Sequence, residues 1–250
     1  MNLYNMIYKR KSFHLFRNTG NEKITTNELA SIKKQFFVFE PLDKSIKVDI
    51  KIVKGEETNC KREEEYCILF YSEKKDNYLQ NIGYIGEQLD LYLTSLNIGT
   101  LWFGIGKTNE QKYNDLDFVI MMAIKKVPEN SFRKDMFNSK RKEVIEIWKG
   151  NKYVDIANIA RFAPSACNLQ PWYVEESLEG LNVYRYKNPG KRGIMPSDMV
   201  NYYNKIDIGI FLCFLELCLK EKSIKYDREI YIDNDDNLID KKLNAIYLIK

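Results

Sequence analysis

The chain has 250 residues, of which 44% are hydrophobic and 13% aromatic, enough for one large domain or two small ones with a buried core. Its 39 basic and 35 acidic residues leave a net charge of +4, too small to indicate nucleic-acid binding. No stretch reaches the roughly 18 apolar residues of a membrane span. No signal peptide is expected either, because a basic cluster follows a short mixed start. We therefore expect a cytoplasmic protein without nucleic-acid or membrane partners.

The cysteines do not follow a metal-binding spacing. Cys60 and Cys67 are separated by a charged run, and Cys213 and Cys218 lie in an apolar run. Only one histidine is present. We therefore expect reduced structural thiols and no metal site.

The first half of the chain shows alternating helical and strand patterns. Helical spacing of apolar residues, or strand-like alternation and β-rich runs, predicts the following elements: helices at 3–9 and 27–34 (N-cap Thr26 or Asn27), strands at 46–53 and 66–71, a helix at 78–96 that breaks at Asn97 and Gly99, and a strand at 118–124. Residues 128–148 are polar and basic and are expected to form a connecting arm.

The order of elements then partly recurs. Patterns in the second half predict a helix at 154–162, strands at 172–174 and 181–186, a helix at 206–219, and strands at 229–232 and 245–249. The helix at 206–219 is apolar on nearly every side and should be buried. Helix, strands, buried helix and strand thus occur twice, which indicates an internal repeat.

A polar turn separates the helix at 154–162 from the next strand. Segment 163–172 reads Ala-Pro-Ser-Ala-Cys-Asn-Leu-Gln-Pro-Trp. Each proline fixes its own φ and disfavours helix at the residue before it, so the helix should end near Phe162. The turn can hold an oxygen-rich ligand with Ser165, Asn168 and Gln170, although an ordinary loop has a similar composition.

Three segments resemble segments of the FMN-dependent nitroreductases. Segment 163–172 is similar to that family's Ala-Pro-Ser-Ser-x-Asn-x-Gln-Pro-Trp. Segment 10–16, Arg-Lys-Ser-Phe-His-Leu-Phe, resembles Arg-Arg-Ser-x-Arg-x-Phe. Segment 96–104, Leu-Asn-Ile-Gly-Thr-Leu-Trp-Phe-Gly, resembles Leu-Gly-Leu-Gly-Thr-x-Trp-x-Gly. The resemblance implies an α+β, nitroreductase-like fold.

The resemblance also implies how the halves cooperate. Nitroreductases are usually intertwined homodimers with FMN in the interface, where one subunit supplies the first two segments and the other supplies the third. Here residues 1–150 carry the first two and residues 151–250 carry the third. This distribution implies a single-chain pseudo-dimer of two unequal halves, each with an antiparallel or mixed sheet and helices. It would have one composite site and act as a monomer.

The resemblance assigns cofactor-binding roles in both halves. Arg10, Lys11 and Ser12 would bind the FMN phosphate by charge and hydrogen bonds. Residues 99–105 would pass along the flavin ring, where backbone N–H groups could stabilise the reduced form. Gln170 is expected to brace the turn and Trp172 to anchor the core. The full FMN-binding set is Arg10, Lys11, Ser12, His14, Trp102, Phe103, Gly104, Ile105, Arg133, Arg141, Pro164, Ser165, Ala166, Asn168 and Gln170. We expect no catalytic side chain.

The implied activity is transfer of two electrons from NADH or NADPH, through FMN, to a nitroaromatic, quinone or similar acceptor. In such an enzyme the cofactor carries out the electron transfer, and the protein binds and orients it. Two alternatives remain open: a non-catalytic protein that stores or senses FMN, and a flavin enzyme of the same fold with another reaction, such as dehalogenation or ring fragmentation.

Overall fold

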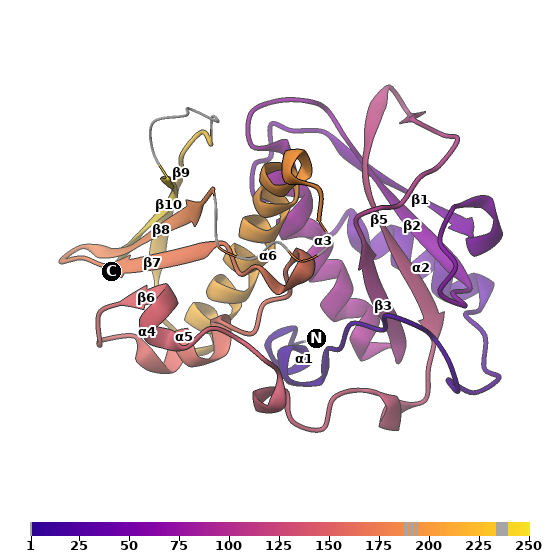
Figure 1. The fold of residues 1–250 in the computed structure, drawn as a ribbon, viewed down its shortest axis with the longest axis horizontal. Helices are drawn as coiled ribbons and strands as arrows, with labels where there is room; N and C mark the ends of the chain where they lie inside the picture. Colours follow the sequence, from indigo (N-terminus) through magenta and orange to yellow (C-terminus); the bar gives the residue numbers. More distant parts are fainter. Residues whose placement is uncertain (1, 188–189, 191–192, 194, 234–239) are drawn as a thin grey trace. The chain divides into compact units, whose positions relative to one another are not determined.

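The structure is a computed structural model that describes residues 2–187, 190, 193, 195–233 and 240–250. The chain forms two compact units (Figure 1). Unit 1 comprises Met1–Tyr78 and Ile85–Met136, and unit 2 comprises Leu79–Tyr84 and Phe137–Lys250. Residues 137–150 therefore belong with the second unit, whereas the sequence-based division assigned them to the first half. Within the described ranges, no helix is long and apolar enough to cross a membrane.

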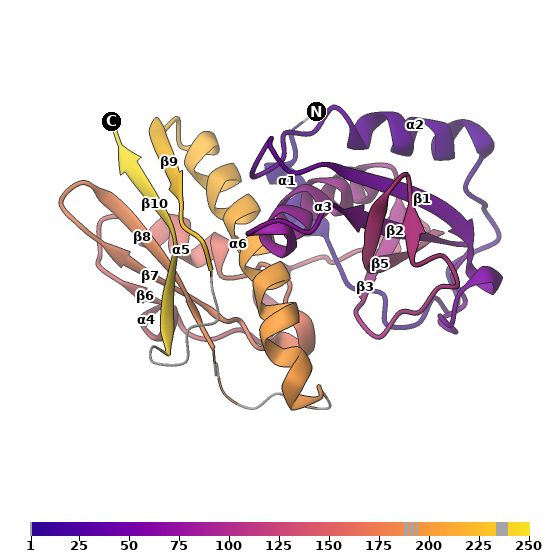
Figure 2. The ribbon, with the colours of Figure 1, turned by 90° about the horizontal axis from the view of Figure 1, so that it is seen from above.

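Unit 1 is built on an antiparallel sheet. Its strands are β1 (Val48–Lys54), β2 (Tyr66–Ser72), β3 (Ile98–Phe103), β4 (Lys112–Tyr113) and β5 (Leu116–Lys126). They follow the order β1-β2-β5-β3, and β4 pairs with β5. The helices are α1 (Tyr4–Lys9), α2 (Thr26–Phe36) and α3 (Tyr78–Ser95), with short 3-10 turns at Gly55–Glu57 and Glu129–Ser131, and a further 3-10 turn, Met136–Asn138, lies where the chain passes into unit 2. Figure 2 shows α2 running along β1.

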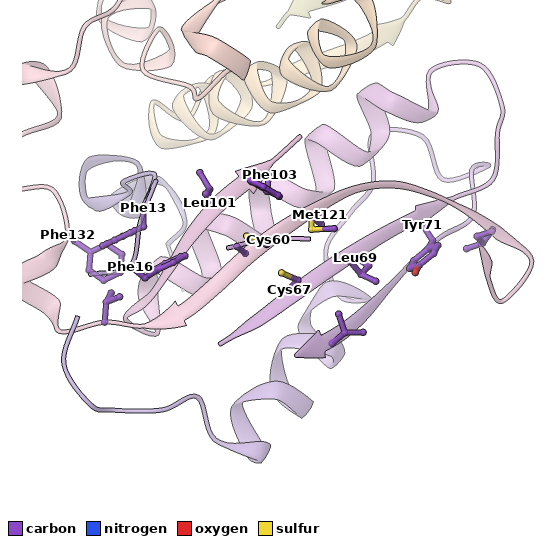
Figure 3. Packing of buried hydrophobic residues seen from close by; sticks show 14 residues of the cluster. Phe13, Phe16, Cys60, Cys67, Leu69, Tyr71, Leu101, Phe103, Met121 and Phe132 are labelled. Atoms are coloured by element: carbon purple, nitrogen blue, oxygen red, sulfur yellow. The ribbon is translucent and has the colours of Figure 1, made fainter. Parts of the chain in front are cut away.

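The two faces of this sheet are covered differently. On one face, Phe36 of α2 and Trp102 of β3 both pack on Phe70, with ring centroids 6.1 and 5.5 Å apart. The other face carries a buried hydrophobic cluster (Figure 3). The strands contribute its inner residues, and the N-terminal segment contributes Phe13 and Phe16, whose rings stack at 5.6 Å. Because side chains alternate along a strand, both faces of β3 are engaged.

Unit 2 has a mixed sheet in the order β6-β7-β8-β10-β9. Its strands are β6 (Trp148–Lys149), β7 (Trp172–Glu176), β8 (Gly180–Tyr186), β9 (Tyr226–Ile230) and β10 (Lys241–Ile249), and β6 pairs with β7 in parallel. Its helices are α4 (Val144–Ile147), α5 (Val154–Ala160) and α6 (Val200–Glu221), with 3-10 turns at Ala166–Asn168 and Ser197–Met199. Trp172 is fully buried and stacks on Phe211 of α6 at 4.9 Å, which confirms it as a core anchor.

Within unit 2, α6 crosses the segment Leu79–Tyr84 of α3 through two glycines. A Cβ placed on Gly83 would lie 2.0 Å from the carbonyl oxygen of Ile206. A Cβ on Gly209 would lie 1.9 Å from the carbonyl oxygen of Gln80. Both obstacles are backbone atoms, which cannot rotate away. The two helices therefore approach as closely as they do because neither carries a side chain at the crossing.

The two sheets repeat one topology. In unit 1, β1 and β2 precede α3, and β3 and β5 follow it, in the order β1-β2-β5-β3. In unit 2, β7 and β8 precede α6, and β9 and β10 follow it, in the order β7-β8-β10-β9. In both groups of strands the last strand in the chain pairs antiparallel with the second one: β5 with β2, and β10 with β8. The order of elements read from the sequence as a repeat is thus present in the strand order as well.

Most predicted elements are confirmed, with shifted ends. The predicted helices correspond to α1, α2, α3, α5 and α6, and the predicted strands correspond to β1, β2, β5, β7, β8, β9 and β10. The N-cap of α2 is Thr25 rather than Thr26 or Asn27. Its hydroxyl accepts from the N–H of Glu28 at 3.2 Å, and the Glu28 carboxylate accepts from the Thr25 N–H at 2.8 Å. This reciprocal capping box fixes the start of the helix.

The region after α3 differs from the prediction. The helix was expected to break at Asn97 and Gly99, and of these two residues it is Asn97 that takes the left-handed position, with φ 56°. Ile98–Phe103 then forms β3, which pairs with β5 over its whole length. Asparagine tolerates the left-handed region because its short side chain can hydrogen-bond locally. The glycine instead makes room for Phe13, whose ring would lie 2.9 Å from an added Cβ.

Candidate functional site

Arg10 is held inside unit 1 by two acidic residues of α3. Its Nε donates to Asp90 Oδ2 at 2.8 Å and lies 3.3 Å from Glu87 Oε1. Its Nη2 donates to Ser12 Oγ at 3.0 Å. Burial opposes the charge, but the carboxylates of Asp90 and Glu87 outweigh it, so the pKa of Arg10 is raised. The residue expected to bind phosphate is therefore already neutralised by the protein.

The two acids connect Arg10 to β3. Asp90 Oδ1 accepts from the hydroxyl of Thr100 at 2.6 Å, and Glu87 Oε2 accepts from Trp102 Nε1 at 3.1 Å. Burial, and then the charge of Asp90, raises the pKa of Glu87 well above its ordinary value. Burial therefore favours the protonated form of Glu87, while Arg10 makes its hydrogen bond to Asp90. This buried network fixes the segment around Ser12 against β3.

Arg133 supplies a positive charge that the protein does not balance. Its backbone N–H donates to the carbonyl of Lys9 at 3.0 Å, which places it beside the Arg10 segment. Its side chain is partly buried, and burial together with repulsion from Arg10 lowers its pKa. Within the part of the chain that the structure describes, the guanidinium of Arg133 has no hydrogen bond or ion pair. Such a group favours an anion as its partner.

The remaining predicted residues of the N-terminal segment are more accessible. Lys11 is exposed, and its Nζ donates to the carbonyl of Ser131 at 3.2 Å. Ser12 is partly buried and bridges to Thr100 of β3. His14 is exposed. Unit 1 thus gathers Lys11, Ser12 and Arg133 near Arg10.

The end of β3 leads to an exposed turn. Trp102 is directed to the α3 face of the sheet, where its ring lies against the position of Gly86. Phe103 is buried on the opposite face. Gly104 is partly buried and Ile105 is exposed. Of the four residues predicted to line a flavin, Trp102 and Phe103 therefore have structural roles, and Gly104 and Ile105 are accessible.

In unit 2, the turn after α5 has an unusual backbone. Cys167, Asn168 and Gln170 all have positive φ, at 51°, 57° and 50°. Non-glycine residues rarely adopt this region, and such strain persists only where neighbouring contacts impose it. Pro164 is buried and anchors the start of the turn, whereas Asn168 is exposed.

Gln170 is the main brace of this turn, as expected from the sequence. It is buried, and its Oε1 accepts from the N–H of Lys142 at 2.8 Å. Its own N–H donates to Ser165 Oγ at 3.0 Å, and its Nε2 donates to the carbonyl of Asn168 at 3.2 Å. Ser165 uses its oxygen as an acceptor here, so its O–H proton stays available to a ligand.

Arg141 supports the same turn from the basic arm. Its Nη1 donates to Asn168 Oδ1 at 3.0 Å, and its Nη2 donates to the carbonyl of Phe162 at 3.2 Å. Asn168 Nδ2 donates in turn to the carbonyl of Lys140 at 3.2 Å. Burial lowers the pKa of the neighbouring Lys142. Arg141 therefore positions Asn168 and keeps positive charge close to it.

Asp207 of α6 is a component of the turn that the sequence did not reveal. Its two carboxylate oxygens accept from the N–H of Ala166 at 3.0 and 3.1 Å. Burial raises the pKa of Asp207 well above its ordinary value, although the Ala166 hydrogen bond opposes this. The Ala166 N–H is thus engaged within the protein. An acidic residue in an apolar helix is the one signal that could have indicated this contact, as for Glu87 and Asp90 on α3.

The fold and these clusters define an α+β protein of the nitroreductase-like class. Residues 2–219 match the family described as "Putative TM nitroreductase", and the chain belongs to this family. A comparison with curated proteins gives no match.

A solved structure described as a "putative nitroreductase", from Thermotoga maritima, has the same fold. The two are 19% identical, the likeness covers 100% of this chain and 93% of that chain, and the TM-score is 0.64. A "Putative NADH Oxidase" from Clostridium acetobutylicum is 12% identical over 57% of this chain and 96% of its own, with a TM-score of 0.41, a likeness too weak to carry an argument.

Proposed function

We propose that this protein is an FMN-dependent oxidoreductase that transfers two electrons from NADH or NADPH to a nitroaromatic, quinone or similar small acceptor. Membership of the nitroreductase family supports an oxidoreductase in general. The observation that supports FMN as the cofactor is the environment of Arg133. Its guanidinium is partly buried, lies near that of Arg10, and has no protein partner among the described residues. This charge fits the phosphate of FMN.

The proposed binding residues divide by task. In unit 1, Arg133 and Lys11 would neutralise the phosphate and Ser12 would donate to it, with Arg10 fixing the segment and His14 beside it. Trp102 and Phe103 would hold β3 in place, so that the backbone of Gly104 and Ile105 is presented to the flavin ring.

In unit 2, the hydroxyl of Ser165 and the amide of Asn168 would bind polar groups of the cofactor. Gln170, Ala166 and Pro164 would fix the shape of the turn, and Arg141 would position Asn168. When bound, FMN supplies the electron transfer, and the protein supplies binding, orientation and charge.

The repeated topology supports the proposal that the chain is a fused pseudo-dimer. The β1-β2-β5-β3 and β7-β8-β10-β9 orders have their long helices, α3 and α6, at the same point of the chain order. An ancestral homodimer with two equal subunits would acquire this arrangement by duplication and fusion.

Reconstitution with flavin tests the proposal directly. The purified chain should bind FMN in preference to FAD, and NADH or NADPH should reduce the bound flavin within minutes and support turnover with an added quinone. Arg133→Gln should weaken FMN binding about tenfold or more, because it removes hydrogen bonds to a charged group. Arg17→Gln is the matched control, since Arg17 is an exposed arginine paired with Glu63.

The outcomes separate the candidates. Failure to bind FMN would refute the proposal. FMN binding without reduction by either nicotinamide would instead favour a storage or sensing protein. Reduction without transfer to nitroaromatics or quinones would favour another flavin reaction, such as dehalogenation.

A further inference from the structure

A group of potential metal ligands lies within unit 1, on residues that have no part in the proposed flavin chemistry. The Sγ atoms of Cys60 and Cys67 and a carboxylate oxygen of Glu64 all lie within 4.8 Å of one another. Both cysteines are free thiols and almost completely buried, at 1% and 0% exposure. Figure 3 shows both cysteines within the buried cluster on the β2–β5 sheet.

We propose that Cys60, Glu64 and Cys67 form a binding site for a zinc ion. Two sulfur ligands and one carboxylate are a donor set that zinc accepts, with a fourth position open to water. Zinc–sulfur bonds of about 2.3 Å at tetrahedral angles place two sulfurs about 3.8 Å apart. The three ligand atoms already lie within 4.8 Å of one another, so shifts of the side chains would bring them to this spacing.

The backbone around the three ligands is fixed before any ion binds. Cys67 lies in β2, where it pairs with Val53 on one side and Ala123 on the other. The Thr58 hydroxyl accepts from the N–H of Cys60 at 3.1 Å and lies 3.5 Å from Cys67 Sγ. The site would therefore bind with little loss of conformational entropy.

Glu64 connects the buried sulfurs to the surface. One of its carboxylate oxygens accepts from the N–H of Arg62 at 2.8 Å, which orients the side chain. The carboxylate also packs over Gly55, where an added Cβ would lie 2.7 Å from Oε1. Glu64 lines an open depression together with Lys54, Gly55, Glu65 and Tyr66. Because Glu64 both lines this depression and lies within 4.8 Å of the two thiols, the depression is the proposed route for an ion.

Cobalt substitution tests the site on the full-length, reduced and metal-free protein. Titration with Co²⁺ should saturate at one equivalent and produce the intense near-ultraviolet absorption of a thiolate bound to cobalt, and Zn²⁺ should displace it. Cys60→Ser and Cys67→Ser should each abolish this absorption. Glu64→Gln should weaken Zn²⁺ binding about tenfold or more while keeping the absorption, because it changes one oxygen ligand. Cys167→Ser, at the exposed cysteine of unit 2, is the control and should bind normally.

Thermal unfolding provides a second readout. Zinc should raise the melting temperature of the wild type, since it binds the folded state, and should leave that of Cys67→Ser unchanged. If Co²⁺ binds without thiolate absorption, or binds Cys60→Ser and Glu64→Gln as tightly as the wild type, the site does not exist. Glu64→Gln replaces a partly exposed residue and is expected to fold, so the proposal does not depend on the buried cysteine variants.

Discussion

Glu87 shows at the scale of one residue how the fold controls a charge. It is completely buried between Arg10, Asp90 and Trp102. Burial, and then Asp90, raises its pKa well above the ordinary value of 4.5. In the unfolded chain the same carboxyl ionises near that ordinary value. As pH rises above 4.5, the unfolded state releases the proton that the folded state retains, so this group lowers stability with rising pH until its folded pKa is reached.

Glu87→Gln should remove this penalty, because glutamine is neutral at every pH and has the same shape. We expect the free energy of unfolding of the variant, relative to that of the wild type, to increase as pH rises from 5 to 8. Urea unfolding at several pH values would measure the difference. Glu63→Gln is an exposed control and should follow the wild-type profile. Parallel profiles for Glu87→Gln and the wild type would show that Glu87 is ionised in the folded protein.

Glu216 is the opposite case, a buried carboxylate that the protein satisfies completely. Its Oε2 accepts from the hydroxyls of Tyr84 and Tyr226 at 2.7 and 2.8 Å. Its Oε1 accepts from Arg228 Nη1 at 2.6 Å and from the hydroxyl of Tyr247 at 2.9 Å. Four donors on two oxygens hold α6 to β9 and β10.

Tyr247→Phe should therefore lower the free energy of unfolding by about 1.5–3 kcal/mol, the value of a buried hydrogen bond to a charged group. Denaturant unfolding monitored by circular dichroism would measure it. Tyr231→Phe is the control, because its hydroxyl donates to Glu229 at the surface and its loss should change stability little. A loss for Tyr247→Phe no larger than that of the control would contradict a stabilising hydrogen bond between Tyr247 and Glu216.

At the scale of elements, the crossing of α6 over residues 79–84 depends on glycine. Gly209→Ala should lower the free energy of unfolding by about 3 kcal/mol or more, because the added methyl meets the backbone of Gln80 and the helices must separate. Gly83→Ala should act in the same way against Ile206. Glu221→Ala, exposed at the end of the same helix, is the control for helix propensity. Wild-type stability for either glycine variant would contradict the packing described.

Helices and strands with a clear apolar pattern were predictable from sequence, whereas β3, which lacks such a pattern, was not. The helical spacing of α3 predicted that helix nearly to its ends, whereas the apolar character of α6 predicted its central and C-terminal part but not its start at Val200. β3 was missed because a six-residue strand with Gly99 near its start has the composition of a turn, and pairing with β5 decides its structure.

Some residues of the candidate site were likewise predictable from sequence and others were not. Gln170 was predicted as a brace because the prolines on either side imply a rigid turn. Asp90 and Asp207 were not, since an acid in a helix usually faces solvent and only tertiary packing reveals its partner. The seven-residue separation of Cys60 and Cys67 is likewise not a zinc spacing. The chain reversal before β2, with the Cys60 loop tied to Thr58, brings the two sulfurs together.

At the scale of the whole molecule, the proposed pseudo-dimer predicts a stoichiometry. Segments 10–16 and 96–104, which resemble nitroreductase segments, occur only in the first half of the chain, and segment 163–172 occurs only in the second. Titration of the flavin-free protein with FMN should therefore saturate at one equivalent per chain. Flavin fluorescence would follow the titration, and mass measurement in solution would establish whether the chain is a monomer. Saturation at two equivalents would mean that each half keeps a complete site.

The helix α3 belongs to both units, because Leu79–Tyr84 lies with unit 2 and Ile85 onward lies with unit 1. A fragment that starts at residue 137 would lack Gly83 at the helix crossing and the Tyr84 hydroxyl on Glu216. No single cut in the gene can therefore release unit 2 with all its parts, and a fragment of residues 1–136 would carry residues 79–84 without the helix that they pack on. Truncation and domain-swap experiments that treat the halves as separable modules would yield unstable pieces, and a split protein would work only by reassembly of both pieces.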